Sequence, residues 1–159
     1  MAEINLHASC ILLAEAGPKL GAAAAAGVLL LGKSGSGKSD LALRLIAMGA
    51  LLVADDRTLL WVEDGVLLGR APPCLHGLIE VRGMGILPLP AAPRAPIRLA
   101  AILGGEANRL PEPERWPLPQ GLERAAAPPL LRLNAFSASA PARIILAAAQ
   151  LGQAPDMDN

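Results

Sequence analysis

The chain has 159 residues, 53% of them hydrophobic, and its 14 Lys plus Arg balance its 14 Asp plus Glu. This length suits one domain with a sizeable core. The zero net charge, with one Phe, two Trp and no Tyr, argues against nucleic acid or an anionic membrane as a partner. The two cysteines, Cys10 and Cys74, lie far apart and form neither a disulfide framework nor a zinc-binding spacing.

The N-terminus shows no targeting pattern. It carries Glu3 and His7 instead of a basic stretch followed by an apolar core, so we expect no signal peptide. The longest uncharged run, between Lys19 and Lys33, is too short to span a bilayer. We therefore expect a cytoplasmic protein with a single domain at 1–159, whose core covers about 5–152 and whose residues 153–159 form a disordered tail.

The N-terminal half alternates apolar runs with turn residues. An unbroken apolar run predicts a buried strand at 24–31, after a first strand at 5–14. The expected elements that follow are a helix at 38–48 that stops at Gly49, a short strand at 51–54, and a hairpin formed by 58–62 and 66–69.

The C-terminal half contains more proline. We expect strands at 78–81 and 97–103, a proline-rich loop at 87–96, and irregular structure at 111–119, where four of nine residues are proline. A final helix at 142–151 is entered through Ser139-Ala140-Pro141. Strands outnumber helices, so the pattern predicts an α/β fold with a mixed β-sheet and flanking helices.

A phosphate-binding loop is the most specific motif. The octapeptide Gly32-Lys33-Ser34-Gly35-Ser36-Gly37-Lys38-Ser39 matches G-x-x-x-x-G-K-[ST] and lies between an expected strand and an expected helix, the context that the motif requires. Its backbone N–H groups would hold phosphate oxygens, Lys38 would reach the β and γ phosphates, and the Ser39 hydroxyl would ligate Mg²⁺. The alternative is a glycine-rich turn without a ligand, which the flanking elements disfavour.

Two aspartates follow the strand expected at 51–54. Neighbouring side chains on a strand point to opposite faces, so Asp55 and Asp56 can have different tasks. One could face Mg²⁺ or its waters, and the other could face an incoming hydroxyl as a general base. Two solvated aspartates at the end of a strand are the alternative. Taken alone, His7 and Glu80 are ordinary strand residues.

A longer set of motifs resembles one family. With the phosphate loop and the Val53-Ala54-Asp55-Asp56 segment, the string Ile79-Glu80-Val81-Arg82-Gly83-Met84-Gly85-Ile86 resembles the catalytic domain of bacterial HPr kinase/phosphorylase, in a short form without the usual N-terminal domain. The resemblance runs from about residue 6 to the final helix. It implies a P-loop kinase fold of the HPr kinase/phosphoenolpyruvate carboxykinase-like type.

The resemblance also implies an activity. Family members transfer phosphate from ATP or pyrophosphate to a serine of HPr, the phosphocarrier of the sugar phosphotransferase system, and need Mg²⁺. The same site runs phosphorolysis, in which inorganic phosphate attacks phosphoserine and releases pyrophosphate. The family assembles as a hexamer, so the resemblance implies a homo-oligomer.

Specific residues match the family's functional positions. The resemblance assigns catalysis to His7, Lys38, Asp56 and Arg109, with Asp56 accepting the serine proton and returning it in reverse. It assigns magnesium binding to Ser39, Asp55 and Glu80, and contact with substrate or phosphate to Arg82 and Arg143. At Arg143 the family has a Pro-x-x-x-Gly-Arg segment, whereas Ala142 precedes the arginine here.

Other nucleotide-binding classes fit less well. A regulatory GTPase needs an N-K-x-D motif, and the sequence has no lysine beyond Lys38. Two alternatives to a protein kinase remain: a small-molecule kinase of the carboxykinase-like class, and a nucleotide-sensing regulator that binds ATP without transferring phosphate.

Overall fold

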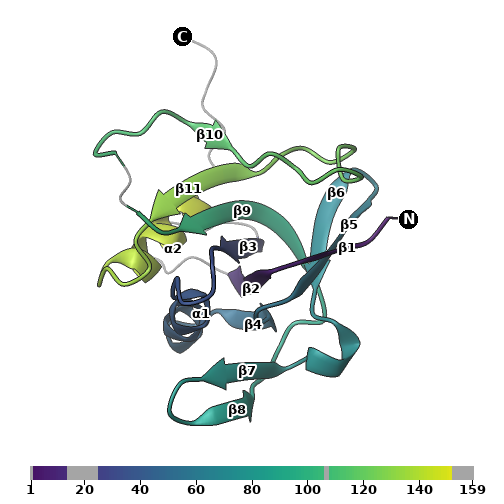
Figure 1. The fold of residues 1–159 in the computed structure, drawn as a ribbon. Coiled ribbons are helices and arrows are strands. Elements are labelled where there is room, and N and C mark those ends of the chain that lie inside the picture. Colours follow the sequence, from purple (N-terminus) through teal and green to yellow (C-terminus); the bar gives the residue numbers. More distant parts are fainter. Residues whose placement is uncertain (1, 14–24, 106–107, 152–159) are drawn as a thin grey trace.

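A mixed β-sheet organises the molecule. The computed structural model describes residues 2–13, 25–105 and 108–151, and within them a nine-stranded sheet has the order β1-β5-β6-β9-β3-β2-β4, with β11 beside β9 and β10 beside β11 (Figure 1). The expected tail at 153–159 lies outside the described residues. The strands are β1 Ile4–Leu6, β2 Ala8–Leu13, β3 Ala26–Leu31, β4 Leu51–Ala54, β5 Thr58–Glu63, β6 Val66–Arg70, β9 Ala95–Leu103, β10 Glu114–Arg115 and β11 Pro129–Leu133.

The central strands bring several loops to one edge of the sheet. β3 and β11 both run parallel to β9, so the carboxyl ends of these three strands lie together. β2 is antiparallel to β3 and to β4, with Ala8 opposite Leu31 and Cys10 opposite Ala54. The start of β2 and the end of β4 therefore lie at the same edge as the end of β3.

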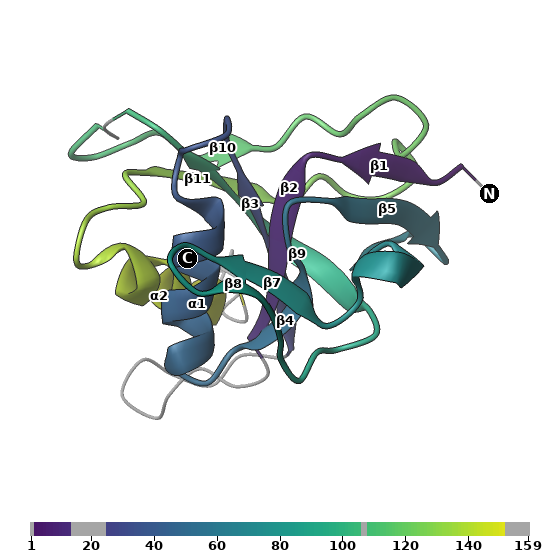
Figure 2. The same cartoon turned by 60° about the horizontal axis from the view of Figure 1, so that its bottom comes forward.

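Two helices cover one face of this sheet. α1 (Lys38–Ala47) and α2 (Ala140–Gln150) lie side by side against it (Figures 1 and 2). Their apolar residues, including Leu41, Leu45 and Ile144, form one core cluster with Val28 and Leu30 of β3. α1 ends where expected, because Gly49 adopts a left-handed φ of 110° that a residue with a side chain rarely adopts.

The opposite face carries a second core cluster. Cys10, Leu29, Leu60 and Ala100 from the strands pack there with Trp116 from the segment that follows β10. The described helices include none long and apolar enough to cross a membrane.

A small hairpin lies apart from the main sheet. β7 (Leu78–Val81) pairs antiparallel with β8 (Gly85–Pro88), and the pair lies next to α1 in Figure 2. A 3₁₀ turn at Pro73–Leu75 precedes it.

The structure corrects several predicted boundaries. The strand expected at 5–14 is broken at His7 into β1 and β2, which pair with β5 and β3 respectively. The segments 87–96 and 111–119 are not wholly irregular: they contain the end of β8, the start of β9, and the two-residue strand β10. Proline is tolerated in these places because it stands at strand ends or on edge strands, where its missing N–H breaks no ladder bond. β11 was not expected at all.

Close packing between β3 and β9 gives a test of the core. A Cβ built on Gly27 would lie 2.6 Å from the carbonyl oxygen of Pro96, a contact that the backbone must move to relieve. We expect Gly27→Ala to lower the free energy of unfolding by about 1–3 kcal/mol, measured by denaturant titration. Val66→Ala, at an exposed position of β6, is the control and should change stability by less than about 0.5 kcal/mol. Equal stability of the two variants would contradict the packing argument.

Candidate active site

The phosphate-loop sequence lies at the edge where the parallel strands end. It follows β3 directly and packs against the end of β9, because a Cβ on Gly32 would lie 2.9 Å from the carbonyl oxygen of Leu103. On its other side, a Cβ on Gly37 would lie 3.0 Å from the Cβ of Ala135, just after β11. Ligands of α/β proteins commonly bind beyond the carboxyl ends of such strands.

The loop has a backbone that only glycine adopts readily. Gly35 and Gly37 have φ values of 82° and 96°, and Gly37 is the residue from which α1 starts. Lys33, Ser34 and Gly35 are exposed, so the outer part of the loop is open to a ligand. The Ser36 hydroxyl is buried and has no hydrogen-bond partner within the described residues.

The ammonium group of Lys38 is buried and bonds to backbone oxygens of its own loop. Its side chain is 6% exposed, and Nζ donates hydrogen bonds to the carbonyls of Gly32 (2.7 Å) and Lys33 (3.0 Å). Desolvation lowers the pKa of Lys38 from its usual 10.5, and the carboxylates of Asp56 and Asp55 oppose that shift. The lysine therefore lies within the electrostatic field of both aspartates.

Asp55 connects four elements. Its Oδ1 accepts hydrogen bonds from the hydroxyls of Ser39 (2.6 Å) and Ser9 (3.2 Å), and its Oδ2 accepts one from the backbone N–H of Glu80 (3.0 Å). These donors belong to α1, β2 and β7, while Asp55 itself follows β4. Only 9% of Asp55 is exposed, so these hydrogen bonds replace water around a buried carboxylate.

Asp56 points in a different direction. Its φ of 66° is left-handed, a conformation that aspartate tolerates better than most residues. Its backbone N–H donates to Ser9 Oγ (3.0 Å), and its Oδ1 lies 2.6 Å from His7 Nε2. The side chain is 59% exposed, so its carboxylate can meet a group that arrives from solution.

The two residues assigned from the 79–86 string are exposed. The backbone N–H of Glu80 donates a hydrogen bond to Asp55, whereas the Glu80 side chain is exposed. Arg82 is exposed in the turn between β7 and β8. Within the described residues, no group of three or more His, Cys, Asp or Glu side chains is arranged to hold a metal ion. A magnesium ion here would therefore depend on Ser39, Asp55, water and phosphate oxygens, which suits an ion that keeps several waters.

Arg109 and Arg143 form a separate group. Both are exposed and line one cavity of about 900 Å³, together with Asn134 and Ser137 from the segment after β11. No hydrogen bond within the described residues joins either arginine to Lys38, Asp55 or Asp56. The structure thus brings His7, Lys38, Asp55, Asp56 and Ser39 together and leaves the two arginines in a neighbouring cavity.

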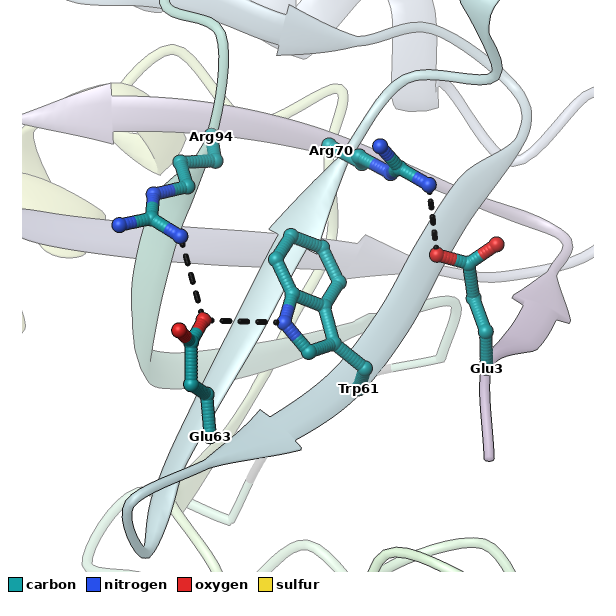
Figure 3. Close-up of a pocket in the computed structure, with 5 residues that line it drawn as sticks. All are labelled: Glu3, Trp61, Glu63, Arg70 and Arg94. Carbon is teal, nitrogen blue, oxygen red and sulfur yellow. Dashed lines mark hydrogen bonds and ion pairs between the residues drawn. The ribbon is translucent and has the colours of Figure 1, made fainter. Parts of the chain in front are cut away.

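A second pocket, of about 250 Å³, contains none of the predicted residues. It is lined by Glu3, Trp61, Glu63, Arg70 and Arg94 (Figure 3). Glu3 pairs with Arg70 at 2.8 Å and Glu63 pairs with Arg94 at 3.2 Å, while the Arg70 guanidinium lies 5.4 Å from the centre of the Trp61 ring. Its charges neutralise one another, so it offers little to an anionic substrate.

Ser9 is a residue of the candidate site that the sequence interpretation missed. It is fully buried, bonds the Asp55 carboxylate and accepts from the Asp56 amide, so it fixes both aspartates. The available signal was a lone hydroxyl residue within the apolar run of β2.

The burial of Lys38 predicts a pH-dependent stability. Folding lowers the pKa of this lysine, so near that pKa the unfolded chain binds more protons and stability rises with pH. Relative to Lys38→Met, the nucleotide-free wild type should become more stable as the pH rises toward the ordinary lysine value of 10.5. Denaturant titrations at several pH values measure this difference. Lys33→Met removes an exposed charge of the same loop and should show no such trend; a flat difference for Lys38→Met would contradict the burial argument.

Comparison with known proteins identifies the motif-bearing segment. Residues 21–92 match the HPr Serine kinase C-terminal domain, a range that contains the phosphate loop, both aspartates and the 79–86 string. The HPr kinase/phosphorylase of Clostridium novyi is 52% identical over 65 residues, which cover 41% of this chain and 21% of that protein. That of Peptoclostridium acidaminophilum is 55% identical over 62 residues, which cover 38% and 20%. The match thus spans about a fifth of the length of these curated relatives.

A solved structure extends the likeness over most of the fold. The Hpr(Ser) kinase/phosphatase from Coxiella burnetii superposes with a TM-score of 0.67 at 24% identity, covering 91% of this chain and 93% of that chain. The mixed α/β fold predicted from the sequence is therefore confirmed. The resemblance that the motifs indicated is confirmed over residues 21–92, which match the HPr Serine kinase C-terminal domain.

Proposed function

We propose that this protein is an ATP-dependent kinase that phosphorylates a serine of an HPr-type phosphocarrier protein. The observation that carries the proposal is the arrangement at one sheet edge. There the buried Lys38 of the phosphate-loop motif and the Ser39–Asp55 pair adjoin an exposed Asp56 that is bonded to His7. Phosphoryl transfer needs this combination of positive charge, oxygen ligands and a base near the acceptor.

The donor half of the site would hold ATP. The loop amides and the N-terminal end of α1 would bind the phosphates, and Lys38 would turn from the loop carbonyls toward them. The Ser39 hydroxyl and the Asp55 carboxylate, 2.6 Å apart, are hard oxygen donors that fit Mg²⁺, with Glu80 beside them. When bound, the ion neutralises charge that develops on the phosphate oxygens.

The acceptor half would use Asp56. Its exposed carboxylate would accept the proton of the incoming serine hydroxyl, and the hydrogen bond with His7 would hold it in position. An exposed base suits a hydroxyl on a protein surface, since a folded acceptor cannot enter a deep pocket. Reversal would use the same groups, so phosphorolysis of phosphoserine with inorganic phosphate is part of the proposal.

The arginines would act on phosphate oxygens. Arg109 would approach the transferring group from its neighbouring cavity, and Arg82 and Arg143 would contact substrate or phosphate. By the same family likeness we propose a homo-oligomer that acts in the cytoplasm.

Direct phosphorylation tests the function. Full-length protein should be incubated with purified HPr, ATP and Mg²⁺, and HPr analysed by mass spectrometry with site mapping. A gain of one phosphate on serine would support the proposal. ATP binding without transfer would favour a nucleotide-sensing regulator, and transfer to a metabolite instead of HPr would favour a small-molecule kinase.

The base assignment has a matched control within the chain. Asp56→Asn should lower the rate of transfer at least about a hundredfold, in both directions, while ATP affinity stays close to wild type. Asp64 is also an exposed aspartate with a positive φ (51°), in the turn between β5 and β6, so Asp64→Asn should leave transfer unchanged. Wild-type turnover in Asp56→Asn would reject the assignment, and comparable losses in both variants would point to a backbone effect.

A further inference from the structure

The only phenylalanine of the sequence occupies an exposed position beside the phosphate loop. The two tryptophans, Trp61 and Trp116, are both buried, whereas Phe136 is 68% exposed. A large apolar side chain with this exposure leaves aromatic surface in contact with water, which a ligand could cover.

The ring contacts the loop itself. A Cβ built on Gly37 would lie 3.2 Å from Cε1 and 3.3 Å from Cζ of Phe136. The edge of the ring therefore touches the residue directly before Lys38, while most of the side chain stays open. Phe136 is thus next to the place where the phosphates of a nucleotide would be held.

The segment that carries the ring is fixed. Ala135 is buried in the core, and the Arg44 guanidinium of α1 donates hydrogen bonds to the carbonyls of Ala135 and Ser137, the latter at 3.2 Å. The backbone N–H of Phe136 donates to Asn134 Oδ1 at 2.9 Å. Arg44 belongs to the helix that begins in the phosphate loop, so the loop and the aromatic ring are held as one unit. A surface that is ordered before binding loses little entropy when a ligand arrives.

Polar groups and space lie next to the ring. Asn134 and Ser137, on either side of Ala135 and Phe136, line the cavity of about 900 Å³ that also contains Arg143. A cavity of this size suits a drug-sized ligand, and its hydroxyl and amide groups suit a sugar.

We propose that Phe136 is the stacking platform for the nucleobase of the phosphoryl donor, so that the segment after β11 forms the nucleoside half of the donor site. The inference rests on the proposed function, in which loop 32–39 holds the polyphosphate. Every base has a π-face, so stacking favours nucleoside triphosphates over inorganic polyphosphates and discriminates weakly between bases.

Two ligands separate the nucleoside contact from the phosphate contact. Titration calorimetry with Mg²⁺ should compare ATP with inorganic tripolyphosphate, which lacks the base and the ribose. Phe136→Ala should weaken ATP binding about fivefold to a hundredfold and leave tripolyphosphate binding unchanged. Phe136→Trp should restore ATP affinity, and its indole fluorescence should change on ATP addition beyond the change seen in wild type.

Control variants identify the other outcomes. Met48→Ala removes an apolar side chain that is 56% exposed at the far end of α1, and it should bind both ligands like wild type. Lys38→Ala should weaken the binding of both ATP and tripolyphosphate. Circular dichroism should confirm that each variant folds.

Three results would overturn the inference. Unchanged ATP affinity in Phe136→Ala, with transfer to HPr lost, would make Phe136 an acceptor contact and leave the kinase proposal standing. Equally weakened binding of ATP and tripolyphosphate in Phe136→Ala would make the residue a structural support of the loop. Failure of the wild type to bind either ligand would remove the proposed function and this inference together.

Discussion

The buried carboxylate of Asp55 is the contact on which the candidate site depends. A carboxylate this deep must be satisfied by hydrogen bonds, and its three donors come from β2, from the first turn of α1 and from β7. Satisfying one side chain therefore fixes the relative positions of four elements. Ser9 extends the arrangement, because the same hydroxyl accepts the Asp56 amide and so sets the direction of the neighbouring carboxylate. A site made in this way is pre-organised by the packing of the sheet and α1 before any ligand is present.

Lys38 is also buried, but unlike that of Asp55 its charge is not well compensated by its hydrogen-bond partners. Its ammonium group is nearly buried, and its present partners are two carbonyls of its own loop, which are dipoles and not full charges. Desolvation lowers the pKa of this lysine in spite of two aspartates nearby. A bound polyphosphate would place negative charge beside this ammonium group. The anion would offset the desolvation of the cation, which favours anion binding. The buried hydroxyl of Ser36 in the same loop, which has no hydrogen-bond partner among the residues that the structure describes, fits this interpretation.

Local patterns in the sequence predicted the part of the fold around the phosphate loop. An unbroken apolar run gave β3, helical periodicity with Gly49 gave α1, and Leu51–Ala54 was correct to the residue. β11 and the two-residue strand β10 were missed because they form by pairing with distant partners, and their own residues are flanked by proline. The same limit applies to the site. Motifs pointed to the phosphate loop and the aspartates, but the roles of Ser9 and Arg44 follow from contacts across 46 and 93 positions of the chain.

The strand order explains why the proposed function gives the candidate site two halves. β4, β3, β9 and β11 all run in one direction, with β2 antiparallel between β4 and β3, so every loop of interest opens at the same edge. On the β2 and β4 side of the phosphate loop stand His7 and the exposed Asp56, which suit an acceptor hydroxyl. On the β9 and β11 side stand Phe136 and the cavity with Arg109 and Arg143, which suit the donor. Lys38 lies between them because the loop follows the strand that separates the two sides. In the proposed reaction, the phosphate would therefore pass from donor to acceptor across the end of β3. Lys38 and the N-terminal end of α1 supply positive charge there.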